Sequence, residues 1–414
     1  MGEIATHVTV GPVRDDAQRI VPDEPLQSNS LERPLLLWTD FAPDHGGGGA
    51  VILRSLVSRD EGPKILWASP AVTRANVSSD VAPMTAGSLG RTGRRSLVLD
   101  STILAPGMAR ETLRLAAARR ARALWIVLHG AGVPVAAALV RQRDLPVHVT
   151  VHDDPAFAVA MRSRRYLALT PWIEWCFAKA LRGAASVDVI SEAMRARYKA
   201  RYGVDAVVVH RALRGPVKPS PAYDRAAHGL RVGILGTVYS YGQLPILARA
   251  VARAARVLGV PARLTLVGLG FAERLRADMH GSGVEVEGTG HLAEADAVEV
   301  LKRCFALYLN YPFAPRDAVL RETSFPTKLS TYVLAARPLL IHAPRDTTIA
   351  PLASQADYAH AWTTMNESDG ADVLVRMWRN PVLGASMHEA ADVVIARYFD
   401  PERNRRALAS VLSR

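Results

Sequence analysis

Short runs of apolar residues alternate with amphipathic segments along most of this chain. The run at 35–38, LLLW, leads into a glycine-rich turn at 45–49 and then into a helical pattern at 50–57. Continuous apolar runs are typical of strands buried on both faces, and their alternation with helices predicts parallel sheets covered by helices. The pattern therefore predicts an α/β protein with doubly wound sheets, whose ligands bind beyond the carboxyl ends of the strands.

This alternation continues through a first predicted domain and then breaks. Further strands are predicted at 64–68, 96–99, 125–129, 147–151, 186–191 and 206–209, and helices at 109–123, 135–143, 171–182 and 192–202. Ser191 precedes the last of these helices and is a favourable N-cap residue. Between 210 and 228, prolines interrupt all periodicity, which predicts an interdomain linker.

A second α/β unit begins at 230. Its strands are predicted at 232–235, 262–267, 284–287 and 305–309, its helices at 244–258 and 294–303, and a mostly helical tail at 371–414 with interruptions at Pro381 and Pro401. The resulting organisation is a mobile tail at 1–32, a first domain at 33–215, a linker at 216–229, a second domain at 230–395 and a helix at 396–414 that can pack back on the first domain.

The stretch 324–341, SFPTKLSTYVLAARPLLI, joins a polar turn, a short apolar helix and a buried strand. Pro326 is tolerated only near a helix start, so Lys328 falls in the first helical turn, where the helix dipole disfavours a cation. A bound phosphate reverses this argument, because free backbone N–H groups and the ammonium then share one anion. Ser324 and Thr331 lie on the same helix face as Lys328. The alternative to this predicted phosphate site is a lysine that extends into solvent.

A glycine run and two histidines follow predicted strands of the first domain. The run at 46–49 lets backbone N–H groups approach an oxyanion closely, the alternative being a flexible loop. Its spacing differs from that of a dinucleotide-binding motif, so no such cofactor is predicted. His129 and His152 end the segments LWIVLHG and VHVTVH, and we expect both to point into the ligand crevice. An isolated histidine is more often structural, but two at adjacent strand ends favour a functional role.

Asp153 and Asp154 offer an alternative chemistry, because adjacent carboxylates can hold Mg²⁺ or Mn²⁺ against a diphosphate. Such an ion needs several oxygen ligands close together, and Pro155 offers no side-chain oxygen after the two aspartates. A metal site is therefore less favoured here than a functional role for the His152 imidazole. Cys176 and Cys304 form no metal-spaced cluster, which gives no support for a zinc motif or a disulfide framework. A reducing cytoplasm fits this cysteine usage.

The chain is basic, with 51 Lys and Arg against 39 Asp and Glu and a formal net charge of +12. This charge favours acidic partners, of which nucleic acid is the weakest candidate because basic runs interleaved with aromatic residues are missing. Seven arginines could rest the first domain on an anionic membrane or form an ordinary solvated face: Arg114, Arg119, Arg120, Arg122, Arg162, Arg164 and Arg165. No signal peptide or membrane-spanning helix is predicted.

In order and spacing, these motifs resemble the retaining glycosyltransferases of the GT-B fold, in the large group often called family 4. The resemblance covers about 34–341 and rests on the glycine turn, the segments VTVHD and SVDVIS, and the series LRVGILGT, LTLVGLG, VEVEGTG and FPTKLSTYVLAARPLL. It implies two Rossmann-like domains facing a central cleft, with the acceptor on the first domain and a nucleotide-diphospho-sugar donor on the second. We expect no catalytic metal or other cofactor, since cations and helix ends can neutralise a leaving diphosphate.

The resemblance also implies roles for individual residues. His152 and Asp153 are the expected catalytic residues, and His129 lies on the acceptor side. The expected donor-binding residues are Gly47, Gly48, Gly236, Thr237, Arg316, Arg321, Glu322, Lys328 and Thr331. Lys328 matches the lysine of family members whose helix starts with a PSKL-like segment.

Two departures from the family bear on function. The loop at 236–245, GTVYSYGQLP, lacks the arginine and lysine that many members have there, and Thr331 stands where a second glutamate is expected. Glu322 is slightly displaced from the position of the first glutamate. Either Arg316, Arg321 and Lys328 meet the phosphate charge, or the site binds no donor.

The leading interpretation is a cytoplasmic glycosyltransferase that builds a cell-surface polysaccharide, glycolipid or other glycoconjugate, with possible peripheral contact with the inner face of an anionic membrane. One alternative is a donor-incompetent binding or scaffold protein. Another is a nucleotide-sugar epimerase.

Overall fold

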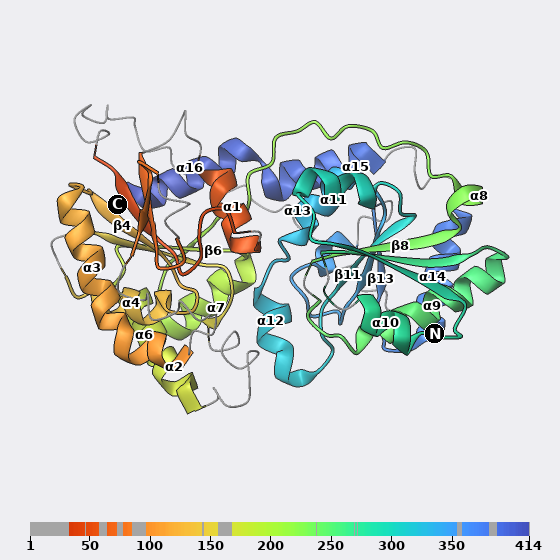
Figure 1. Ribbon diagram of the computed structural model, residues 1–414, viewed down its shortest axis with the longest axis horizontal. Helices are drawn as coiled ribbons and strands as arrows, with labels where there is room; N and C mark the ends of the chain where they lie inside the picture. Colours follow the sequence, from red (N-terminus) through yellow and green to blue (C-terminus); the bar gives the residue numbers. More distant parts are fainter. Residues whose placement is uncertain are drawn as a thin grey trace, which may run out of the picture.

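The computed structural model describes residues 33–45, 47–57, 64–72, 78–84, 97–142, 145–155, 168–236, 238–268, 270, 272–353, 358–380 and 387–413. The predicted tail at 1–32 and the arginines Arg162, Arg164 and Arg165 lie outside these ranges. The described chain forms two parallel sheets, each covered by helices, in two units that lie side by side (Figure 1). The predicted pair of doubly wound α/β units is therefore confirmed.

The first sheet has the strand order β3-β2-β1-β4-β5-β6-β7. Its strands are β1 (Leu35–Trp38), β2 (Ile65–Ser69), β3 (Val81–Pro83), β4 (Ala123–Val127), β5 (Val147–Val151), β6 (Ser186–Val189) and β7 (Val207–Val208). The helical segments that join them are α1 (Gly48–Leu56), α2 (Leu97–Leu99), η4 (Asp100–Leu104, π-helical), α3 (Ala105–Ala118), α4 (Gly132–Leu139), α6 (Thr170–Gly183) and α7 (Glu192–Tyr202). The winding direction reverses between β1 and β4, where open α/β sheets bind ligands.

The second sheet has the strand order β10-β9-β8-β11-β12-β13, so its winding reverses between β8 and β11. Its strands are β8 (Leu230–Leu235), β9 (Ala262–Val267), β10 (Val284–Gly290), β11 (Ala306–Asn310), β12 (Leu339–His342) and β13 (Ala359–Trp362). Its helical segments are α8 (Arg225–His228), α9 (Gln243–Leu258), α10 (Ala272–Asp278), α11 (Glu294–Leu301), η6 (Pro315–Asp317), α12 (Ala318–Thr323), α13 (Lys328–Ala335), η7 (Ala350–Leu352), α14 (Glu367–Arg379), α15 (Met387–Val394) and η8 (Ile395–Phe399).

Most predicted strands and helices form, but the predicted strand at 96–99 is wrong. Residues 97–99 are helical and continue through η4 into α3. Apolar periodicity alone does not separate a short strand from a short helical segment, and the adjacent helical sequence decides the outcome here. The strands β3 and β13 were not predicted, because each is short and carries little apolar pattern.

The last helix, α16 (Pro401–Leu412), leaves the second unit and packs on the first (Figure 1). The Ser186 hydroxyl of β6 donates to the Val411 carbonyl at 2.7 Å, and Asn404 Oδ1 accepts from the His210 backbone N–H at 3.0 Å. Arg122, predicted to lie on a solvated or membrane-facing surface, instead donates to the Leu412 carbonyl at 3.3 Å. A cation beside the carboxyl end of a helix is favourable, because the last carbonyls lack intrahelical partners.

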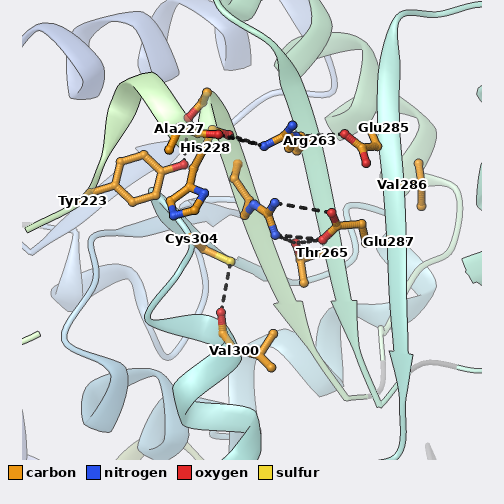
Figure 2. A network of polar contacts seen from close by, with 12 residues as sticks. Tyr223, Ala227, His228, Arg263, Thr265, Glu285, Val286, Glu287, Val300 and Cys304 are labelled. Atoms are coloured by element: carbon orange, nitrogen blue, oxygen red, sulfur yellow. Dashed lines mark hydrogen bonds and ion pairs between the residues drawn. The ribbon is translucent and has the colours of Figure 1, made fainter. Parts of the chain in front are cut away.

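Ion pairs cross the strands at one end of the second sheet, as Figure 2 shows. Arg263 of β9 donates to Glu285 of β10 at 2.9 Å and also reaches the carbonyls of Ala227 and His228. Arg231 of β8 donates to Glu287 at 2.8 Å. Cross-strand pairs of opposite charge support the register of strands that are only partly buried.

Candidate functional site

Asp40 and His129 meet beyond the carboxyl ends of β1 and β4, at the point where the winding of the first sheet reverses. The two oxygens of the Asp40 carboxylate lie 2.9 and 3.0 Å from His129 Nδ1. His129 is half-exposed while Asp40 is more enclosed. Hydrogen bonding to Asp40 orients the imidazole, so the predicted acceptor-side histidine is held rather than freely rotating.

The glycine turn lies at the start of α1. Gly47 N–H donates to His45 Nδ1 at 2.8 Å, and the Arg54 guanidinium donates to the carbonyls of Pro43 and His45, which fixes the residues before the turn. A β-carbon on Gly48 would lie 2.7 Å from Thr327 Oγ1, so only glycine fits this position without movement. Gly46 lies outside the described residues.

This contact joins the two units at their candidate sites. Thr327 immediately precedes α13, whose first residue is Lys328. The amino end of α1 in the first unit therefore lies against the amino end of α13 in the second. Both ends carry the positive end of a helix dipole, which favours anions, although in α13 the N–H groups of Leu329 and Ser330 donate to the Pro326 and Thr327 carbonyls.

His152 and Asp153 follow β5, on the first-unit side of this junction. A β-carbon on Gly49 would lie 3.1 Å from His152 Nδ1, so the imidazole packs beside the glycine turn. Burial lowers the pKa of His152 to about 4, with a weaker opposite effect from Asp188. The histidine is therefore neutral at physiological pH. Solvent reaches Asp153, yet the surrounding protein displaces much of its water, and this desolvation raises the pKa of its carboxyl.

Asp154 is buried, with its carboxylate 3.5 Å from the Tyr198 hydroxyl of α7. Asp153, by contrast, is exposed. Within the described ranges, no three His, Cys, Asp or Glu side chains are arranged to hold a metal ion.

Lys328 occupies the first turn of α13, as predicted, and is partly buried. Burial lowers its pKa to about 7. Its ammonium lies 5.6 Å from the ring centre of Tyr239, which stacks on Tyr311 with a centroid distance of 5.1 Å. Tyr332 fixes the helix, because its hydroxyl donates to the Tyr308 carbonyl on β11.

The two stacked tyrosines come from loops after β8 and β11, where the winding of the second sheet reverses. Tyr311 donates to the Ser324 carbonyl at 3.0 Å, so Ser324, Lys328 and the tyrosines form one cluster. The loop that lacks basic residues thus presents an aromatic ring beside Lys328.

A carboxylate does lie beside Thr331, but it comes from another helix. Thr331 is buried, and its hydroxyl donates to Glu294 of α11 at 2.8 Å. Arg211 binds the same carboxylate through both terminal nitrogens at 2.5 and 2.6 Å and also donates to Ser330 at 2.9 Å. These contacts lower the pKa of Glu294 despite its burial. Arg211, which follows β7, and Glu294 of α11 therefore hold α13 in place.

Two of the predicted donor-binding cations, Arg321 and Arg316, lie beside carboxylates of the second unit. Arg321 donates to Asp346 at 2.9 to 3.1 Å and to the Ala314 carbonyl at 3.0 Å, so its guanidinium is occupied by structural contacts. Arg316 is exposed and lies 3.9 Å from Asp317. Glu322 is partly exposed near the end of α12. That Arg316 and Arg321 join Lys328 around a phosphate stays a prediction.

Gly236 follows β8 with φ of +61°, a left-handed conformation that favours glycine. No atom lies within 4 Å of a β-carbon built on it, so the turn leaves open space at the end of the strand. Thr237 lies outside the described residues.

Four site residues escaped prediction: Asp40, Arg211, Glu294 and Tyr311. Asp40 had a usable signal, since it follows a buried strand as His129 does. The other three depend on contacts between segments far apart in sequence, for example the 83 positions between Arg211 and Glu294.

Comparisons with known proteins bear on the fold. No protein-family model matches the chain, and no curated protein matches its sequence. Sucrose-phosphate synthase from Thermosynechococcus elongatus is similar in structure, with a TM-score of 0.69, 13% identity, and 92% of this chain and 98% of that chain covered. HepE from Anabaena in complex with UDP-glucose has a TM-score of 0.63 and 15% identity, covering 92% and 99%.

A third similar structure is a Listeria monocytogenes protein assigned as a UDP-N-acetylglucosamine 2-epimerase, with a TM-score of 0.55, 12% identity, and coverage of 92% and 95%. At these identities the likeness concerns the fold. The chain has the GT-B fold, two Rossmann-like domains arranged as in glycosyltransferases. The expected GT-B fold class is thereby confirmed.

Proposed function

We propose that this protein is a glycosyltransferase that moves a sugar from a nucleotide-diphospho-sugar to a glycan or lipid-linked acceptor. The observation that carries the proposal is the junction of the amino ends of α1 and α13, with Gly48 against Thr327 and Lys328 one residue further. A diphosphate fits this junction chemically, because two helix amino ends and the neighbouring Lys328 ammonium contribute positive charge of the same sign to this region. The UDP and UDP-glucose bound by HepE, which shares the fold, support this ligand class.

Cleavage of the bond between the sugar and the diphosphate develops negative charge on the leaving oxygen. Lys328 and the positive ends of the two helix dipoles would stabilise that charge. A bound diphosphate raises the pKa of Lys328, so the ammonium form becomes the dominant one when the donor arrives. In this proposal the site needs no metal ion for charge neutralisation.

His152 and Asp153 would contact the reacting sugar from the first domain. A neutral imidazole can donate or accept a hydrogen bond without competing for the diphosphate, and the low pKa of His152 keeps it neutral. The acceptor would approach from the side of His129 and Asp40. Retention of the anomeric configuration and a cytoplasmic location are proposed from the resemblance to family 4.

Nucleotide binding tests the proposal. Thermal-shift titrations with UDP, GDP, ADP and dTDP, followed by the corresponding nucleotide sugars, should identify at least one diphosphate that raises the melting temperature. Incubation with the sugar form of that nucleotide should then release the nucleoside diphosphate. If none of these ligands stabilises the protein, the glycosyltransferase proposal fails.

A donor-incompetent scaffold is the second candidate, and one observation favours it. The guanidinium of Arg321, a predicted donor-binding residue, is engaged by Asp346. Absence of stabilisation by every nucleotide, with the chain folded, would favour this candidate. The shared fold also permits an epimerase, which product analysis of a single turnover separates from a transferase, because an epimerase returns a nucleotide sugar.

A further inference from the structure

Four large apolar side chains are exposed on adjoining helical segments of the first domain. They are Leu99 at 43%, Ile103 at 70%, Trp172 at 40% and Trp175 at 50% of full exposure. Single exposed apolar residues are ordinary, whereas a contiguous group marks a surface that binds something. We call this group the tryptophan face.

The tryptophan face is held in place by specific contacts. Trp172 Nε1 donates to the Ser101 carbonyl at 3.0 Å, which ties α6 to η4 between the positions of Leu99 and Ile103. The rings of Trp172 and Trp175 stack with a centroid distance of 5.1 Å and an interplanar angle of 19°. Helices α2 and α6 lie next to each other on the outer side of the first domain (Figure 1). These tryptophans are therefore ordered while still reaching solvent.

Basic residues adjoin the tryptophan face. An open groove of about 430 Å³ between the carboxyl ends of α4 and α6 is lined by Trp175, Arg141, Lys179 and Arg182. The Lys179 ammonium lies 4.7 Å from the Trp175 ring centre. Desolvation and the positive charge of Arg141 lower the pKa of Lys179. The acidic residue of this helix, Glu174, is paired with Arg201 at 3.2 Å, so the groove keeps a positive potential.

We propose that the tryptophan face and its basic groove dock the protein on a membrane that contains anionic lipids. Tryptophan has an apolar ring and a polar N–H and concentrates where hydrocarbon meets water. Lysine and arginine beside such rings bind the negative surface of anionic lipids. A second copy of this chain is the competing occupant, and its presence is one outcome of the test below.

Membrane docking through the tryptophan face would also orient the candidate functional site. Helix α6 lies between β5 and β6 in a parallel sheet, so its amino end, which carries Trp172, is at the same sheet edge as His152. A membrane against the tryptophan face would therefore lie beside the edge from which His129 and His152 project. This inference concerns binding to lipid alone and needs no nucleotide.

Vesicle sedimentation with the full chain tests the proposal, without any nucleotide. We expect the protein to sediment with phosphatidylcholine vesicles that contain about 30% phosphatidylglycerol, and to bind less as salt rises from about 0.1 to about 0.5 M. Trp172→Ser with Trp175→Ser should lower the partition coefficient roughly tenfold or more. Lys179→Gln and Arg182→Gln should each lower it about fivefold.

Two further variants guard against misfolding and non-specific effects. Ile103→Glu changes the most exposed residue of the face and should weaken binding while leaving the melting temperature unchanged. On the opposite domain, Val257 is 59% exposed and Arg253 is exposed, both on α9, so Val257→Ser and Arg253→Gln serve as matched controls with unchanged binding.

The outcomes separate clearly. Loss of vesicle binding in the tryptophan and cation variants, with the controls unaffected, supports the proposal. Failure of the wild-type protein to bind any vesicle, or binding that the face variants do not change, overturns it. A dimer in light scattering that dissociates in Ile103→Glu, with no vesicle binding, would instead assign the face to a second copy of this chain. Nucleotide thermal shifts in the same variants should match wild type, so a failure here leaves the transferase proposal standing.

Discussion

Replacing Lys328 with methionine should have opposite effects on stability and on ligand binding. Methionine keeps the length of the side chain and removes the charge. In the folded protein the pKa of Lys328 is lowered from 10.5 to about 7, so the folded state binds this proton less tightly than the unfolded state does. Burial of the ammonium therefore costs stability at pH below 7, and the cost declines as pH rises from 7 towards 10.5.

The magnitude follows from the size of that change. If the whole difference between the two pKa values acted on the free energy of unfolding, it would correspond to at most about 5 kcal/mol. Because Lys328 is only partly buried, we expect Lys328→Met to raise the free energy of unfolding by about 1 to 2 kcal/mol at pH 6 and by less at pH 9. Removal of a cation that pairs with a bound diphosphate should cost at least about 2 kcal/mol of binding, roughly a thirtyfold increase in Kd.

The assay is urea denaturation of wild type and Lys328→Met at pH 6 and pH 9, combined with calorimetric titration of the stabilising nucleotide at pH 7. Lys218, an exposed lysine of the linker, provides the control. Lys218→Met should change stability by less than about 0.5 kcal/mol and leave the Kd unchanged. The reasoning is refuted if Lys328→Met is less stable than wild type at pH 6 and binds nucleotide with the same affinity.

Three other substitutions or treatments have defined expected results. Ala336 ends α13 with φ of +45°, so Ala336→Gly should raise the free energy of unfolding by about 1 kcal/mol in urea melts, and a decrease would show that the turn is not strained. Gly48→Ala places a methyl 2.7 Å from Thr327 Oγ1 and should weaken nucleotide binding, whereas Gly242→Ala, with open space around it, should not; equal affinities in calorimetry would argue against the junction as the binding site. Cys176 and Cys304 are buried with pKa values raised to about 11 and 12, so a thiol reagent should label neither until denaturant is added, and rapid labelling of the native protein would contradict their burial.

The fold was accessible from the sequence because the strands of a doubly wound sheet are buried on both faces. Segments such as β1 and β4 are continuous apolar runs, and the predicted bounds of β5 and β9, 147–151 and 262–267, match the structure. The helix at 192–202 also matches, since Ser191 provides a cap that accepts a hydrogen bond from Met194 N–H. Local chemistry alone specifies such elements.

The secondary-structure predictions fail where tertiary contacts or neighbouring segments determine the conformation. Residues 97–99 carry an apolar run that fits a strand, yet the helix that follows extends back over them. The β3 and β13 strands are edge strands with little apolar pattern, and pairing with β2 and β12 forms them.

The candidate site was predictable in part for the same reason. His152 and Lys328 are adjacent to elements with clear local signals, a strand end and a helix start. The contact of Arg321 with Asp346 was not predicted, because the carboxylate comes from a different loop. Glu294 reaches Thr331 through the packing of two helices, which no local pattern encodes.

The return of α16 to the first domain has a consequence for synthesis of the protein. Ser186 on β6 and the backbone of His210 obtain hydrogen-bond partners from residues 404–411, which leave the ribosome after the entire second domain. The first domain emerges early but keeps the surface beneath α16 uncovered throughout that interval. We therefore expect the second domain to complete its own packing first, and the earlier domain to close last, when the final helix folds back over it.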